Sequence, residues 1–175
     1  MVPLRARLAA VACAVGVVAG AVSGIGLVGC AGAADAGGAG RAVTVRDAEG
    51  ALLAQVPLTA GTFAVSYRNS IYRTPAEERY RVAADGRFVL VELAADQLAV
   101  LEEYYAVPGP VTAAPDGDRR NWVAAPDRNP AFAELSIAAT ALGERTLHVP
   151  GHPPVALPPL APSDPTVVLD VEESS

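Results

Sequence analysis

The sequence predicts an all-β domain: an antiparallel β-sandwich or partly open barrel of about eight or nine strands, with at most one short helix. Apolar residues recur mainly at every second position, which is the period of a half-buried strand. Turn-forming residues separate these runs at short intervals. Of the 15 prolines, 14 follow residue 29, which suits loops and sheet edges and argues against long helices.

Alternating runs predict three strands, at residues 62–68, 133–138 and 166–172. The first run shows the pattern most clearly, because Phe63, Val65 and Tyr67 fall on one face. Residues 88–91 are apolar without alternation, as expected of a central strand that is covered on both faces.

Three turns predict β-hairpins, at residues 47–50, 84–86 and 150–152. Each turn contains a glycine, the residue that adopts the positive φ required by tight hairpins. The predicted flanking strands are 43–45 with 52–56, 80–82 with 88–93, and 147–149 with 155–157.

Residues 96–105 form the one helical candidate, with a strand as the alternative. Asp96 is the predicted N-cap, and Leu98, Leu101 and Tyr105 follow at helical spacing. Residues 106–130 fit no element and are rich in proline, glycine, aspartate and arginine. A loop of this length in a small domain is usually functional or disordered.

The N-terminus reads as a lipoprotein signal peptide over residues 1–29. Two arginines precede a stretch without charge from residue 8 to 28, and the sequence Leu-Val-Gly then leads to Cys30. We expect Cys30 to be lipidated and residues 30–41 to form a flexible tether. The remaining residues, 42–175, would be one domain on the extracytoplasmic face of the cell membrane. An uncleaved membrane anchor and a freely secreted product are the alternatives, and both also place the domain outside the cytoplasm.

Composition excludes two classes of function for the mature chain. Removing residues 1–29 removes two arginines and no acid, leaving 11 arginines against 19 acids, a net charge of −8. Such an acidic domain is not a nucleic-acid binder. The two cysteines are Cys13 and Cys30, so the domain itself has neither a disulfide nor a reactive thiol.

The densest polar segment runs from Tyr67 to Tyr80, and here the chain resembles a known family, domain-of-unknown-function family 1850. Members carry an aromatic strand that ends in His-Ser, then a proline, then a glutamate followed by an aromatic residue. The matching positions in this chain are Asn69, Ser70, Pro75, Glu78 and Tyr80. Shorter similarities follow at residues 85–93, 101–105 and 146–157.

The resemblance implies an accessory role in solute uptake, because genes of the family often lie beside TRAP transporters of the TAXI subclass. It therefore implies the TRAP permease or the TAXI solute receptor as a partner, and it supplies no activity. The chain departs from the family where Asn69 replaces the usual histidine. An amide neither titrates nor binds transition metals well, so any role that needs this histidine is absent.

The polar residues of this segment allow two interpretations. In the first, arginines and amides at the strand end bind a small anionic solute or a partner protein. In the second, Asn69 and Ser70 cap a turn, and Glu78 pairs with Arg68 or Arg73. The candidate binding residues are Tyr67, Arg68, Asn69, Ser70, Arg73, Glu78 and Tyr105.

The sequence offers little for catalysis, metal binding or a cofactor. No Gly-x-Ser-x-Gly motif is present, and the adjacent acids at 77–78 and 102–103 would point to opposite faces of a strand. His148 and His152 have a helical metal spacing, but Pro150 and Gly151 exclude a helix between them. We therefore expect a non-enzymatic protein without metal or cofactor.

Overall fold

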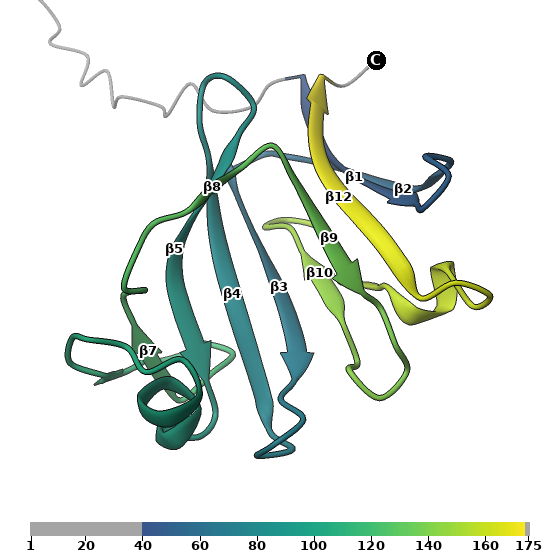
Figure 1. Ribbon diagram of the computed structural model, residues 1–175. Helices are drawn as coiled ribbons and strands as arrows, with labels where there is room; N and C mark the ends of the chain where they lie inside the picture. The colour runs from purple at the N-terminus through teal and green to yellow at the C-terminus, as the bar shows by residue number, and fades with distance from the viewer. Residues whose placement is uncertain (1–39, 174–175) are drawn as a thin grey trace, which may run out of the picture. The chain divides into compact units, whose positions relative to one another are not determined.

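The computed structural model describes residues 40–173, which form two antiparallel β-sheets, neither closed into a barrel (Figure 1). The predicted all-β class is confirmed. Nine strands contain three or more residues, and three further strands contain two each. The predicted signal peptide, Cys30 and nearly all of the tether lie outside the described residues.

The smaller sheet has four strands in the order β2-β1-β12-β9. Along the chain their bounds are β1 Arg41–Asp47, β2 Leu52–Pro57, β9 Glu134–Ala138 and β12 Thr166–Glu173. β1 and β12 pair over seven residues, from Arg41 opposite Glu173 to Asp47 opposite Val167.

The larger sheet has the order β11-β10-β3-β4-β5-β7-β6, and β8 also pairs with β5. Its long central strands are β3 Thr62–Arg68, β4 Pro75–Val82 and β5 Phe88–Ala95. The shorter strands are β6 Thr112–Ala113, β7 Trp122–Ala124, β8 Ala131–Phe132, β10 Thr146–His148 and β11 Val155–Ala156.

All three predicted hairpins are confirmed: β1 with β2, β4 with β5, and β10 with β11. Their glycines have the positive φ that the turns require, with 87° at Gly50, 86° at Gly86 and 82° at Gly151. The predicted strands at 62–68, 133–138 and 166–172 correspond to β3, β9 and β12.

The helical candidate is shorter than predicted, and its N-cap was wrong. A π-helical turn, η1, spans Val100–Tyr104, and Ala99 at its start makes no capping side-chain hydrogen bond. Asp96 instead continues the strand pairing, because its backbone N–H donates to the carbonyl of Pro75 at 3.1 Å. A 3-10 turn, η2, spans Pro158–Leu160. Neither turn, nor any other helical segment within residues 40–173, has the length and apolar composition of a membrane span.

The main core lies between the two sheets. Phe63, Tyr80 and Phe88 pack together on the inner face of the larger sheet, with ring centroids 5.1 to 5.5 Å apart. Val43 and Leu169 of the smaller sheet are fully buried against this cluster. Burial of aromatic side chains supplies much of the apolar area that stabilises such a domain.

A second apolar cluster lies at the other end of the larger sheet, where η1 replaces the smaller sheet as a cover. Val100 and Leu101 of η1 are fully buried and pack with Tyr67, Leu93 and Ala124. The helical spacing that the sequence shows over this segment therefore reflects packing on the sheet.

A β-bulge interrupts the pairing of β4 with β5. Arg79 lies opposite Glu92, but the next residue, Tyr80, lies opposite Leu90, so Val91 is an extra residue in β5. Bulges of this kind bend a strand and increase its twist.

Candidate functional site

The outer face of the larger sheet carries a buried polar cluster. The register places Glu77 opposite Ser66 and Arg79 opposite Ala64. β10 adds His148, which is also opposite Ala64, on the other side of β3. Side chains opposite each other share a face, so these residues point away from the aromatic core.

Glu77 is the centre of this cluster and is 0% exposed. Its carboxylate accepts hydrogen bonds from Arg119 at 2.6 and 3.0 Å and from Nε of Arg79 at 2.8 Å. Nε of Arg120 lies 3.8 Å away. Burial alone would raise the pKa of Glu77, but the hydrogen bonds from Arg119 and Arg79 outweigh it and hold the pKa below its usual value. The carboxylate is therefore charged at neutral pH.

Arg79 joins the sheet to the long segment that follows η1. Besides Glu77, its guanidinium contacts Glu92 at 2.6 Å and both carboxylate oxygens of Asp118, at 2.6 and 2.9 Å. The hydrogen bond from Arg79 is the largest cause of a lowered pKa at Asp118. All three guanidinium nitrogens of Arg79 are engaged, so this residue fixes the loop on the sheet and has little capacity left for a ligand.

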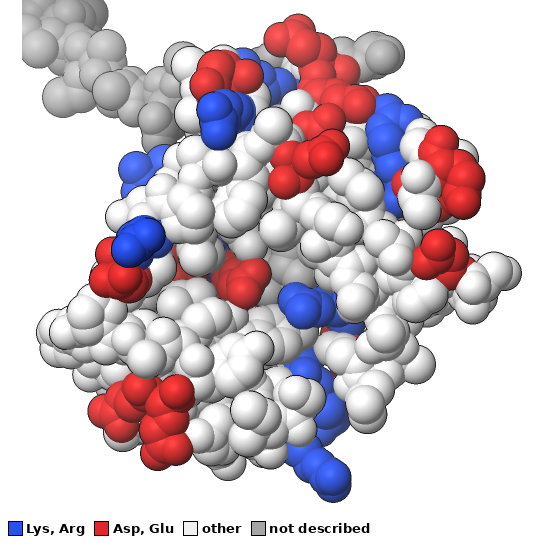
Figure 2. All heavy atoms as spheres, in the orientation of Figure 1, with Lys and Arg blue, Asp and Glu red and all other residues white. Residues whose placement is uncertain are grey.

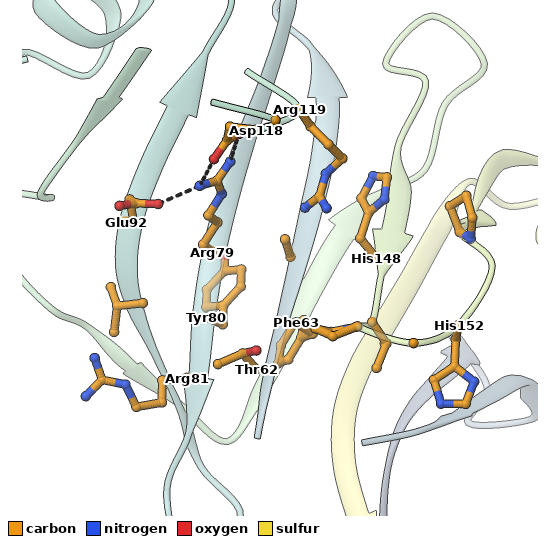
Figure 3. Close-up of a pocket in the computed structure, with 17 residues that line it drawn as sticks. Thr62, Phe63, Arg79, Tyr80, Arg81, Glu92, Asp118, Arg119, His148 and His152 are labelled. Carbon is orange, nitrogen blue, oxygen red and sulfur yellow. Dashed lines mark hydrogen bonds and ion pairs between the residues drawn. The ribbon is translucent and has the colours of Figure 1, made fainter. Parts of the chain in front are cut away.

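A pocket of about 870 Å³ lies over this face, beside the polar cluster (Figure 3). Its floor includes Ala64, a small residue between the larger His148 and Arg79 on the two neighbouring strands. The charged or imidazole side chains of its lining are Arg79, Arg81, Glu92, Asp118, Arg119, His148 and His152. In Figure 3, Arg119 reaches into the space between Arg79 and His148.

The two histidines bring polar atoms to the pocket. Nε2 of His148 lies 2.8 Å from Oγ of Ser66. Burial, followed by the charge of Arg119, lowers the pKa of His148, so its ring is neutral at neutral pH. Nε2 of His152 is buried and has no hydrogen-bond partner within residues 40–173. Within the same range, no group of three or more potential ligand side chains could hold a metal ion.

The structure places Asn69 of the predicted segment in a structural turn. Asn69 is 1% exposed, and its Oδ1 accepts hydrogen bonds from the backbone N–H groups of Ile71 and Tyr72, both at 3.0 Å. Ser70 is exposed, as is Arg73, which has a φ of 55°. These positions fit the turn interpretation.

Arg68 and Arg73 do not line the pocket, and neither forms an ion pair with Glu78. Arg68 instead pairs with Glu144 at 2.9 Å and donates to the carbonyl of Arg73. The pairing expected in the turn interpretation is thus wrong in its partner, because Glu78 points to the inner face of the sheet.

Three of the candidate residues do come together, on that inner face. The hydroxyl of Tyr105 donates to Glu78 at 2.8 Å and lies 2.5 Å from the hydroxyl of Tyr67. Tyr80 donates to the second carboxylate oxygen of Glu78 at 2.7 Å. The guanidinium of Arg145 lies over the ring of Tyr67, 4.5 Å from its centroid. The tyrosines and Glu78 thus form one hydrogen-bonded network, which we call the tyrosine–glutamate network.

Sequence reasoning missed Arg79, Asp118, Arg119 and His148 as site residues. Ser66 and His148 are 82 positions apart, and Glu77 and Arg119 are 42 apart, so no local motif joins them. The available signal was the polar pair Glu77 and Arg79 at alternate positions within an otherwise regular strand.

Charge is distributed unevenly over the described residues. On the face seen in Figure 2, several acidic and basic side chains lie next to each other, and uncharged surface separates these small charged groups. Residues 40–173 contain 11 arginines and 18 acids, a net charge of −7. The pocket lining contains three arginines and two acids, and the buried Glu77 binds two of these arginines.

Comparison of the chain with protein-family models, curated proteins and solved structures found no match. The resemblance to family 1850 therefore rests on the residues quoted above.

Proposed function

We propose that this chain is a non-enzymatic, membrane-anchored extracytoplasmic protein that binds a small anionic solute in the outer-face pocket. The observation that carries the proposal is that two arginines of the pocket lining, Arg81 and Arg119, keep guanidinium donors without a partner in residues 40–173. Ligand pockets generally combine a concave surface with a few convergent polar groups, and this pocket has both.

Two arginines of the lining have donors available for an anion. Nη1 of Arg119 has no hydrogen-bond partner in residues 40–173, although Nε and Nη2 hold Glu77. Arg81 forms no ion pair within this part of the chain. A guanidinium with free N–H groups binds carboxylates and phosphates by charged hydrogen bonds.

His148 would add a neutral donor. If the Ser66 hydroxyl donates to Nε2 of His148, the ring proton lies on Nδ1, which then serves as a donor. Neutral donors orient an anion without adding charge.

The sequence supplies the cellular setting of the proposal. A lipidated Cys30 would hold the domain at the membrane, and the family resemblance suggests an accessory of a TRAP-type uptake system. A tether raises the effective concentration of the domain near a permease or TAXI receptor, so weak docking is sufficient. Co-purification of the anchored protein with the permease or receptor would test this setting separately.

Binding is tested by isothermal titration of the full chain in detergent with succinate and, in parallel, with the uncharged succinamide. We expect saturable binding of succinate alone. Replacing Arg81 by Gln or Arg119 by Gln should each weaken binding at least about tenfold, since a charged hydrogen bond contributes about 1.5–3 kcal/mol.

Arg128→Gln is the matched control, because Arg128 is 89% exposed and lies outside the pocket lining. It should bind succinate as the wild type does. Equal weakening by all three substitutions would point to general electrostatics and contradict a specific site. Inorganic phosphate, titrated in the same way, separates carboxylate from phosphate preference.

A further inference from the structure

The tyrosine–glutamate network contains the acid Glu78, and the base Arg145 lies against it over the ring of Tyr67. These two side chains do not form an ion pair with each other. Glu78 and Arg145 are both half-buried. Arg145 lies over Tyr67, whose hydroxyl is joined to Glu78 through Tyr105. Yet neither Glu78 nor Arg145 forms an ion pair within residues 40–173. Partly buried charges are normally paired, so this separation needs an explanation.

The hydroxyl groups define the direction of the network. Tyr105 donates its single proton to Glu78, so Tyr67 must be the donor to the oxygen of Tyr105. Burial raises the pKa of Tyr67 to about 12, and burial and then the charge of Glu78 raise that of Tyr105. Both hydroxyls stay protonated at neutral pH and hold the Glu78 carboxylate in a fixed orientation.

Arg145 is held differently, by a cation–π contact rather than by hydrogen bonds. Its guanidinium carbon lies 4.5 Å from the centroid of the Tyr67 ring, and no guanidinium N–H group has a hydrogen-bond partner in the described part of the chain. A guanidinium held in this way keeps its forked donors available for a planar acceptor such as a carboxylate. Its backbone carbonyl accepts a bond from Leu157, which fixes the residue at the start of β10.

We propose that Glu78 and Arg145 form a second binding site, for a small zwitterion of the α-amino acid class. The ligand's ammonium group would donate to Glu78, and its carboxylate would accept the forked donors of Arg145. This site is separate from the outer-face pocket, because Glu78 and Tyr67 point to the opposite face of the sheet. The inference therefore does not depend on the proposed anion site.

The test uses the full chain in detergent with labelled tyrosine rings, observed by NMR during titration with L-leucine. Two matched probes lack one charge each: isoamylamine has no carboxylate, and 4-methylpentanoate has no ammonium. We expect saturable shifts of the Tyr67 and Tyr105 ring signals with leucine. Each single-charge probe should bind at least about tenfold more weakly, because one charged partner is lost.

Variants separate this site from the outer-face pocket. Arg145→Gln should abolish leucine binding without unfolding the protein, because the Arg145 side chain makes no hydrogen bond in the described residues. Glu78→Gln keeps one of the two acceptor oxygens that bind tyrosine hydroxyls but loses the charge, and it should also abolish binding. Arg81→Gln is the control: it should weaken succinate binding and leave leucine binding unchanged.

Three results would overturn the proposal: absence of saturable tyrosine shifts, equal binding of leucine and 4-methylpentanoate, or normal leucine binding by Arg145→Gln. Any of these would leave the network a purely structural link between η1 and the sheet. Loss of succinate binding to the wild type would instead count against the outer-face pocket alone.

Discussion

The two faces of the central strands β3, β4 and β5 are covered by different chemistry, the inner face fully and the outer face in part. The smaller sheet covers the inner face and packs against the rings of Phe63, Tyr80 and Phe88. The outer face is covered by a loop that Glu77 and Arg79 hold through charged hydrogen bonds. Apolar packing tolerates many partners, whereas a charged cluster requires particular ones. The comparison suggests that the inner face stabilises the fold and the outer face positions a site.

The largest effect should come from the inner face. Phe88 is fully buried and contacts three other rings. Phe88→Ala should lower the free energy of unfolding by about 4 kcal/mol, because lost burial and a residual cavity add together. Urea unfolding followed by circular dichroism measures this loss. A change below about 1 kcal/mol would contradict the assignment of the main core.

The outer face should be next. Glu77→Gln removes the one fully buried carboxylate among three arginines and should cost about 3 kcal/mol, because the guanidinium groups lose their shared partner. Limited proteolysis should then cut near Asp118 faster than in the wild type. Glu172→Gln is the control, since its pair with Arg46 is partly exposed and should be worth at most about 1 kcal/mol. Similar losses in both variants would mean that the cluster has no special role.

A smaller effect is expected at the turn between β3 and β4. Asn69→Ala removes the acceptor of two backbone N–H groups and should cost about 1–2 kcal/mol. Ser70→Ala, at the exposed neighbouring position, should change stability by less than about 0.5 kcal/mol. Paired thermal melts would check both values. If Ser70→Ala proved the more damaging substitution, the turn would depend on contacts other than the Asn69 cap.

The smallest effect is a pH dependence of the outer face. The folded protein binds a proton at His148 less readily than the unfolded chain, whose histidine pKa is near 6.5. The free energy of unfolding should therefore fall as pH drops below about 6.5, until His148 is protonated in the folded state as well. Chemical unfolding between about pH 7 and 5 measures this decline. The lowered pKa values of Glu77 and Asp118 affect stability only at more acidic pH, nearer their usual values of 4.5 and 3.8.

His148→Gln isolates the histidine contribution, because glutamine does not titrate in this range. Its unfolding free energy should vary less with pH than that of the wild type. An unchanged pH profile in the variant would assign the decline to another group.

Local patterns predicted much of the fold. Turns that contain glycine predicted the three hairpins, and alternating apolar residues predicted β3, β9 and β12. Both patterns can be recognised because each lies within a few consecutive residues. The short strands β6 and β7 were not predicted. They lie within the proline-rich segment and exist because Trp122 and Val123 pair with the end of β5. Pairing of this kind depends on the tertiary structure rather than on local preference.

The candidate site was predicted only in part. Tyr67, Glu78 and Tyr105 do meet. The polar segment from Tyr67 to Tyr80 supplied the first two, and Tyr105 came from the separate similarity at residues 101–105. Arg68 and Arg73 were selected because arginine binds anions, but they lie at the turn between β3 and β4 and do not line the pocket. Arg119 and His148 reach the pocket through contacts across distant strands, which a single sequence does not reveal.

The bulge in β5 has a consequence for how one strand contributes to both faces. Phe88 and Glu92 are four positions apart, so in a regular strand they would point the same way. Val91, the extra residue, reverses the alternation between them, so that Phe88 enters the core while Glu92 reaches Arg79 on the outer face. One inserted residue thus changes the face of the sheet to which the following side chains of β5 point. The chain length at this position is therefore under tighter constraint than the identity of Val91.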